Sequence, residues 1–382
     1  MQEILPSKLN NMKIPFVDLK AQYHSIKTDI DSAITNVLEE TSFIGGKQLE
    51  LFEKRFAELC GVKHCIGVAN GTDSLYIIMK MLGIGLGDEV ITTAHSWISS
   101  SETISQTGAT PVFVDTELDY FTIDISKIES KITNQTKAII PVHIYGQMVN
   151  MDELIILSKK YNIPIIEDCA QSHFSKYNGR IAGTIGIAGS FSFYPGKNLG
   201  AYGDAGCIIT NDDMLAENCK MFARHGALVK HQHQMEGINS RLDGLQAAVL
   251  NVKLNHILKW THSRIINAGL YHSKFKKLNL PNFSYPITRP NTDHTFHLYV
   301  IKSKYRDELK SYLNELGVET AIHYPTILPL LACYKHRNFN KLEFTNSFTD
   351  SEQILSIPMY PELTESQIDY IVECIAQFYR QK

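Results

Sequence analysis

Two ionisable residues in the middle of the chain each follow a short segment with the pattern of a β-strand. Asp168 ends the apolar segment 163–168, which has the composition of a buried parallel strand. Lys197 closes the turn-forming sequence YPGK, which follows the alternating segment 190–193. Because ligands bind at the carboxyl ends of strands in open α/β sheets, we expect both side chains in one site.

An acid and a lysine at two strand ends are typical of pyridoxal phosphate chemistry. The lysine can bond to the cofactor aldehyde, and the acid can pair with the protonated pyridine nitrogen, which keeps the ring an electron sink. Taken singly, each residue is more often a surface lysine or a structural aspartate, because charged side chains are mostly exposed. The surrounding sequence favours the cofactor hypothesis.

A third candidate element is the turn that follows a predicted strand at residues 65–69. The turn consists of small polar residues and precedes an apolar helical segment. A strand, such a turn and a helix N-terminus together form an anion site. The backbone N–H groups of Gly71, Thr72 and Asp73 could therefore hold the cofactor phosphate. Asp73 could instead be only a helix cap.

Strand-like and helix-like patterns alternate along most of the chain, which predicts an α/β fold with a mainly parallel sheet. The strands are expected at 65–69, 88–93, 109–115, 137–147, 163–168, 190–193 and 205–210. One long helix is expected from Leu242 to about Phe275. Beyond it we expect a strand at 295–301, a helix at 306–316 and a strand at 318–321. We therefore predict a large domain over residues 1–250 and a small α+β domain over residues 251–382.

The composition is that of a globular enzyme, with 44% hydrophobic and 20% charged residues among 382. The net charge of -3 favours neither nucleic acid nor an anionic membrane surface as a partner. No apolar run approaches the roughly 18 residues of a membrane span. The opening residues lack the apolar region of a signal peptide, and we expect an extension before Met12. Seven cysteines without a CxxC pair suit reduced thiols in the cytoplasm.

The sequence EDCAQSH followed by SFSFYPGKNLGAYGDAG resembles the DegT/StrS-type nucleotide-sugar aminotransferases. These are fold-type I pyridoxal phosphate enzymes with a mainly parallel, seven-stranded type of sheet. The resemblance covers nearly the whole chain, from IPFVDLKAQY at Ile14 to the last predicted helix. Within the family, the chain is most similar to the branch that aminates C3 of dTDP-3-keto-6-deoxyhexoses.

The resemblance assigns a part of the cofactor to each of five residues. It implies that Lys197 carries the cofactor and that Asp168 pairs with the pyridine nitrogen. Trp97 would stack on one face of the ring, where a core aromatic is the alternative, and Gln171 would cover the other face. Ser192 would bind the phosphate together with the turn at Gly71–Asp73, where a structural strand serine is the alternative.

Further assignments from the resemblance concern the neighbouring subunit and the substrate. Asn239, in GINSRLDGLQAAVL, would reach the phosphate site of the partner in a homodimer, with Arg241 close by. Arg241 could instead meet a substrate anion. His323 and Tyr324, in the sequence HYP, would contact the substrate. A second histidine that follows this sequence in the family is absent here, because residues 326–329 read TILP.

The resemblance implies transamination of a nucleotide-linked ketosugar, with L-glutamate as the amino donor, for cell-surface polysaccharide such as O-antigen or a related amino sugar. Two alternatives remain open: a 4-ketosugar linked to UDP or GDP, and a non-catalytic regulatory protein that binds the cofactor or a sugar. The intact Lys197 favours transamination over the related sugar dehydratases, which carry a histidine in its place.

No metal site is predicted. The polar segment 225–235 contains His231 and His233, but no second ligand pair of suitable spacing accompanies them. We interpret this segment as a mobile loop near the active site.

Overall fold

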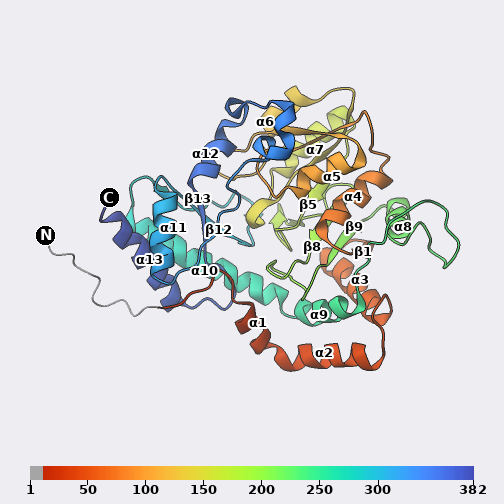
Figure 1. Cartoon of the computed structure of the whole chain (residues 1–382), viewed down its shortest axis with the longest axis horizontal. Helices are drawn as coiled ribbons and strands as arrows, with labels where there is room; N and C mark the ends of the chain where they lie inside the picture. Colours follow the sequence, from red (N-terminus) through yellow and green to blue (C-terminus); the bar gives the residue numbers. More distant parts are fainter. Residues whose placement is uncertain (1–11) are drawn as a thin grey trace.

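The computed structural model describes residues 12–382 (Figure 1). The predicted extension before Met12 lies outside the described residues. Within them, strands of one central sheet are flanked by helices, and a second, smaller group of strands and helices follows at the C-terminal end of the chain (Figure 1). No helix of this part of the chain is both long and apolar enough to cross a membrane.

Within residues 12–382, seven strands build the central sheet, in the order β1-β9-β8-β5-β4-β2-β3. They are β1 (His64–Val68), β2 (Glu89–Thr93), β3 (Thr110–Val114), β4 (Thr136–Ile140), β5 (Ile166–Asp168), β8 (Ala188–Ser192) and β9 (Gly206–Thr210). Two parallel bridges, Ile139 to Ile165 and Val142 to Asp168, join β4 to β5. Only β9 runs antiparallel to its neighbours, so the prediction of a mainly parallel sheet is confirmed.

Helices cover both faces of this sheet. On one face lie α2 (Lys27–Glu39), α3 (Lys47–Cys60), α7 (Met151–Tyr161) and α9 (Gly244–Leu254). On the other lie α4 (Gly71–Met81), α5 (Ser99–Thr107) and α8 (Asp213–Phe222). Successive residues of β9 alternate between the two cores: Cys207 and Ile209 join the first, and Ile208 joins the second. This alternation is the period of two of a strand buried on both faces.

The last third of the chain builds a second apolar core. An antiparallel sheet, in the order β10-β12-β13, packs there with α10, α11 and α13. The strands are β10 (Phe283–Ser284), β12 (Tyr299–Ser303) and β13 (Ile354–Ile357). The helices are α10 (Ile257–Leu278), α11 (Arg306–Glu315) and α13 (Glu365–Tyr379), with α12 (Thr345–Gln353) outside this core. Ile14 also belongs to this core, and it bridges to Val318 after α11.

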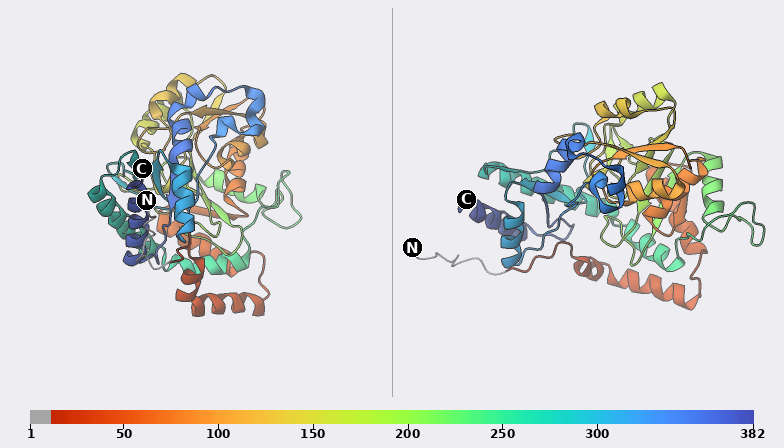
Figure 2. Two further views of the ribbon diagram at one scale, coloured as in Figure 1. Left: turned by 60° about the vertical axis from the view of Figure 1, so that its left-hand side comes forward. Right: turned by 45° about the horizontal axis from the view of Figure 1, so that its top comes forward.

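Smaller elements complete the fold. The remaining helices are α1 (Leu19–Ser25) and α6 (Ile125–Ile128), and the 3-10 turns are η1 (Glu129–Lys131), η2 (Ile144–Gly146), η3 (Leu328–Leu330), η4 (Ala332–Arg337) and η5 (Lys341–Phe344). A separate small sheet, in the order β11-β6-β7, consists of β6 (Lys176–Tyr177), β7 (Arg180–Ile181) and β11 (Thr292–Asp293). The segment after α8, coloured green, projects from the body of the molecule (Figures 1 and 2).

Four predicted elements differ from the structure. The strand predicted at 137–147 ends at Ile140, because residues 144–146 form the turn η2, in which Tyr145 has a φ of 60°. The single helix predicted from Leu242 to Phe275 is two helices, α9 and α10, because the chain turns at Asn255 and His256. The strand predicted at 295–301 begins only at Tyr299, since Phe296 has a φ of 43°, which is incompatible with extended backbone.

Residues 318–321 form no strand either. Val318 and Ala321 make single bridges, to Ile14 and to Ser356, and these bridges are isolated. The proposed division of the chain at residue 250 stays a prediction. Residues of α10 pack in both cores, with Trp260 in the first and Tyr271 in the second.

Candidate active site

Lys197 and Asp168 line one pocket at the carboxyl ends of the central strands. Its volume is about 830 Å³, within the range typical of small-molecule sites. The predicted residues that line it are Gly71, Thr72, Asp73, Trp97, Asp168, Gln171, Ser192, Lys197, His323 and Tyr324. Asn239 and Arg241 do not line it. The fold therefore gathers most of the candidates from segments far apart in the sequence.

The start of α4 offers backbone N–H groups to an anion. Asn70 is its cap residue, because the side-chain oxygen of Asn70 accepts the N–H of Asp73 at 2.8 Å. Asp73 is therefore not the cap, and its N–H is already engaged. Within residues 12–382, the N–H groups of Gly71 and Thr72 make no hydrogen bond. These two groups at a helix N-terminus fit a phosphate.

Gly71 lies directly against Ser192 at the end of β8. A methyl group on Gly71 would stand 2.7 Å from Cβ of Ser192 and 3.2 Å from its Cα. No ordinary contact is that short, so only glycine fits between the two segments. Ser192 lines the same pocket as Gly71 and Thr72, and its role in binding the phosphate stays a prediction.

Asp168 is buried and held by two hydrogen bonds. Ser100 donates its hydroxyl to Oδ2 at 2.8 Å, and the N–H of Ala170 donates to Oδ1 at 3.1 Å. Burial raises the pKa of Asp168 above its ordinary value, and these hydrogen bonds oppose that effect. A buried carboxylate of this kind is stabilised by a cationic ligand group. Asp168 therefore fits the protonated pyridine nitrogen of the cofactor.

Ser100 escaped the analysis of the sequence. It lies in the first turn of α5, and nothing in the local pattern distinguishes it from the adjacent serines 99 and 101. Only the packing of α5 beside the end of β5 brings its hydroxyl to the carboxylate.

Trp97, Gln171 and Tyr324 form one connected part of the wall. Trp97 is 57% exposed, so it is not a core aromatic. Its ring centroid lies 5.6 Å from that of Tyr324. Gln171 donates through Nε2 to the Tyr324 hydroxyl at 3.1 Å, and its Oε1 accepts the N–H of Tyr145 at 2.7 Å. These bonds fix the orientation of the amide, and the clamp of the ring by Trp97 and Gln171 stays a prediction.

Lys197 is held at the pocket by the turn that precedes it. Its N–H donates to the carbonyl of Tyr194 at 2.8 Å. The segment that follows Lys197 is also held in place, because the fully buried Lys253 donates to the carbonyl of Gly200 at 2.6 Å. Burial lowers the pKa of Lys197 to about 8, while the charge of Asp168 acts in the opposite direction. A substantial fraction of the amine is therefore neutral near pH 8.

His323 enters the pocket wall from the C-terminal part of the chain. Its Nδ1 lies 2.9 Å from the hydroxyl of Ser356. Burial lowers the pKa of His323 to about 4, which makes the ring neutral at physiological pH. Its carbonyl accepts the hydroxyl of Tyr145.

The segment TILP, where the family carries a second histidine, lies outside the pocket lining. Ile327 and Leu328 are buried in an apolar cluster with Ala94 and Phe113. The N–H of Leu328 donates to the carbonyl of Ala94 at 2.8 Å, which fixes this packing. In this chain the segment anchors the pocket wall to the end of β2.

Neither Asn239 nor the histidine-containing segment lines this pocket. Asn239 is exposed and makes a single bridge to Arg224. No residue of the segment 225–235 lines the pocket of its own chain. The segment 225–235 belongs to the part of the chain after α8 that projects from the body (Figure 1).

His231 and His233 are not part of any cluster of potential metal ligands among residues 12–382. The cluster found there consists of His143, Glu167 and Cys169, all buried. Glu167 accepts Nε2 of His143 at 2.9 Å and three backbone N–H groups between residues 183 and 186. The cluster is thus satisfied by hydrogen bonds, as expected of a structural element.

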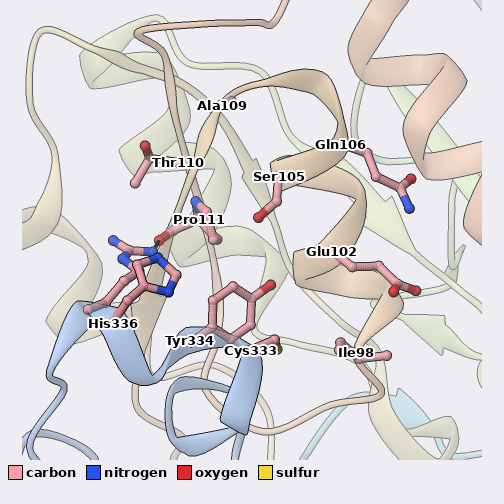
Figure 3. A pocket seen from close by; sticks show the side chains of 11 residues that line it. Ile98, Glu102, Ser105, Gln106, Ala109, Thr110, Pro111, Cys333, Tyr334 and His336 are labelled. Carbon is pink, nitrogen blue, oxygen red and sulfur yellow. Dashed lines mark hydrogen bonds between the residues drawn. The ribbon is translucent and has the colours of Figure 1, made fainter.

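A second hollow of about 640 Å³ lies between α5 and η4 (Figure 3). Glu102 and Ser105 face it from α5, and Tyr334 and His336 face it from η4 (Figure 3). It contains none of the predicted site residues.

Gly71→Ala should weaken binding of pyridoxal phosphate by about tenfold or more. The added methyl overlaps Ser192, and overpacking of this kind typically costs about 1–3 kcal/mol. Titration of the cofactor-free variant, followed by visible absorbance, measures the loss. Gly269→Ala is the matched control, because a methyl there meets nothing within 4 Å. Equal affinity of both variants would contradict the proposed cradle.

Residues 24–376 match the model of the DegT/DnrJ/EryC1/StrS aminotransferase family. The chain is 41% identical over 97% of its length to the "Pleiotropic regulatory protein" of Geobacillus stearothermophilus, of which it covers 99%. It is also 41% identical, over 96% of its length and 99% of the relative, to "dTDP-3-amino-3,6-dideoxy-alpha-D-galactopyranose transaminase" of Aneurinibacillus thermoaerophilus.

Among solved structures, DesV of S. venezuelae in complex with a ketimine intermediate superposes with a TM-score of 0.94, at 39% identity. The match covers 96% of this chain and 98% of that one. The expected fold of the pyridoxal phosphate aminotransferases is therefore confirmed. The chain belongs to the DegT/DnrJ/EryC1/StrS aminotransferase family and is a sugar aminotransferase with pyridoxal phosphate as its cofactor.

Proposed function

We propose that this enzyme transfers an amino group from L-glutamate to C3 of a dTDP-linked 3-keto-6-deoxyhexose. The observation that supports it most is the 41% identity to a relative named as a dTDP-3-amino-3,6-dideoxygalactopyranose transaminase. The family resemblance suggests L-glutamate as the donor. The product would serve the synthesis of a cell-surface polysaccharide such as O-antigen.

Transamination needs a general base, an acid that pairs with the pyridine nitrogen, and a cofactor ring held in one orientation. Bound pyridoxal phosphate supplies an electrophilic carbon and an electron sink. In our proposal the neutral amine of Lys197 moves a proton between the donor α-carbon and the cofactor, acting as general base and acid. Asp168 keeps the pyridine nitrogen protonated, and Ser100 orients that carboxylate. Gly71, Thr72 and Ser192 bind the phosphate.

We propose further that the active unit is a homodimer and that Asn239 of one protomer completes the phosphate site of the other. Two features support this. The ionisable residues that line one pocket include three acids, Asp73, Asp168 and Asp204, and a single lysine. A phosphate dianion and a sugar diphosphate need more donors than this set provides. Asn239 is exposed and does not line the pocket of its own chain.

We also propose a cytoplasmic location. All seven cysteines are unpaired and six of them are buried, as expected where thiols stay reduced.

The amine of Lys197 should bond to pyridoxal phosphate faster as pH rises, with a midpoint near pH 8. Below its pKa of about 8 the amine is protonated and cannot attack an aldehyde. Brief exposure of the cofactor-free enzyme, borohydride trapping and mass spectrometry of the Lys197 peptide measure the profile. A midpoint near 10.5, the ordinary value, would contradict the role of burial.

Two variants serve as controls for this profile. Asp168→Asn should move the midpoint to lower pH, because the Asp168 charge raises the pKa of Lys197. Lys197→Ala should show no label at this peptide. It should also lose at least about 100-fold in turnover, which is the lower end of what one positioned base contributes.

The substrate assignment predicts a defined product. Incubated with L-glutamate and a panel of dTDP-, UDP- and GDP-linked 3- and 4-ketosugars, the enzyme should convert the dTDP-linked 3-keto-6-deoxyhexose fastest. Mass spectrometry and NMR identify the aminated carbon. Amination at C4, or preference for another nucleotide, would overturn this assignment and leave the sugar aminotransferase activity standing.

Mixing two inactive variants tests the shared site. If Asn239 acts across the interface, a heterodimer of Asn239→Ala and Lys197→Ala carries both lesions in one site and leaves the other intact. Random exchange into two-fold dimers should then restore about a quarter of wild-type activity. Absence of recovery despite proven exchange would place Asn239 in the site of its own chain.

A further inference from the structure

His297 lies in the pocket wall with Lys197, and the mechanism described above does not use it. It is buried, with 8% of its surface exposed, and it lines the pocket together with Leu298. His297 and Lys197 line the same pocket, so the ring nitrogen of His297 that faces the pocket can contact a bound ligand.

The hydrogen bonds of Asn198 determine the state of this ring. Nδ2 of Asn198 donates to the carbonyl of Thr295 at 3.2 Å, so its Oδ1 is the atom that faces His297. Oδ1 lies 3.2 Å from Nδ1 of His297. Because an amide oxygen only accepts, Nδ1 of His297 must carry the proton of this bond. Asn198 is the residue next to Lys197, so the ring is coupled to the loop that carries the lysine.

The second ring nitrogen, Nε2, makes no protein hydrogen bond among the described residues, and it is not sealed in the interior. Burial, together with the positive charges of Lys197 and Arg264, holds the pKa of His297 well below its ordinary value. The ring is therefore neutral, and Nε2 presents a lone pair to the pocket. A lone pair accepts hydroxyl or amine hydrogens and repels carboxylate and phosphate oxygens.

Arg264 fixes the backbone that carries the ring. Its guanidinium donates through Nη1 to the carbonyls of Phe296 at 3.2 Å, His297 at 3.3 Å and Met359 at 2.8 Å. Arg264 is itself buried on α10, and Met359 also lines the pocket. The backbone on both sides of His297 is therefore fixed.

We propose that His297 is a substrate-binding residue whose Nε2 accepts a hydrogen bond from a hydroxyl group of the sugar, and that Asn198 holds the ring in the tautomer that can do so. The inference rests on the sugar aminotransferase activity and not on which sugar or nucleotide is used. In this proposal the amino acid donor, which carries carboxylates, does not contact Nε2 of His297.

Two substitutions separate the two ring nitrogens. His297→Asn keeps a donor near the position of Nδ1, for Asn198, but has no atom at the position of Nε2. His297→Gln places an amide oxygen near the position of Nε2 and loses the contact with Asn198. Each holoenzyme is mixed in single turnovers with L-glutamate, and separately with the amino-sugar nucleotide that wild type deaminates fastest. Loss of the visible cofactor absorbance reports both half-reactions.

His297→Asn should raise the apparent Kd for the amino-sugar nucleotide about tenfold, the upper range for one neutral hydrogen bond. Its apparent Kd for L-glutamate and its affinity for pyridoxal phosphate should stay within about twofold of wild type. His297→Gln should recover most of the amino-sugar affinity. Because the probe is whichever sugar wild type converts, an error in the sugar assignment does not alter this comparison.

An unchanged amino-sugar Kd in His297→Asn would overturn the proposal, and so would an equal loss in both half-reactions, which is what a merely structural role predicts. If His297→Asn does not bind cofactor, His297→Gln decides alone. Amino-sugar affinity within about threefold of wild type supports the role of the acceptor, and a larger loss overturns it.

Discussion

The contact between the start of α4 and the ends of two strands is the constraint on which the rest of the site depends. Gly206, the first residue of β9, pairs with Val68 at the end of β1 and with Ser192 at the end of β8. Since β9 is antiparallel, it begins where its two neighbours end. A methyl on Gly206 would lie 2.4 Å from the carbonyl carbon of Asn70. The absence of a side chain there lets the turn after β1 lie over the sheet, so that Gly71 reaches Ser192.

This arrangement explains why a single antiparallel strand in a parallel sheet favours a cofactor site. The ends of β1 and β8 meet the start of β9 at one point, and two of these positions carry small residues, Ser192 and Gly206. The free N–H groups at the start of α4 can then face a phosphate beside the serine hydroxyl. At the same edge of the sheet, Asp168 is buried and Lys197 is partly buried, and removal from water disfavours the charged form of each. A ligand with a cationic ring nitrogen would offset this cost at Asp168, and an anionic phosphate on the same ligand would meet the free N–H groups at the start of α4.

Much of this could be predicted from the sequence, because the informative patterns are local. Buried strands that end in acids, and a turn before Lys197, are properties of consecutive residues. The direction of β9 cannot be predicted from consecutive residues, since a strand has the same period of two in either direction. The break between α9 and α10 contains neither proline nor glycine, so no local signal marks it. Ser100 and Asn198 were missed for the same reason: each acts through a partner far away in the sequence, Asp168 or His297.

Tyr145 shows how the fold stabilises a local conformation that the sequence alone disfavours. Its φ of 60° lies in the left-handed region, which costs a residue with a side chain on the order of 1–2 kcal/mol. The conformation directs its N–H to Oε1 of Gln171, while its hydroxyl donates to the carbonyl of His323. Gln171 in turn holds the hydroxyl of Tyr324. One strained residue thus connects the end of β5 to the segment that carries His323 and Tyr324. Because these bonds offset the strain only when both segments are in place, the pocket wall and the sheet edge are formed together.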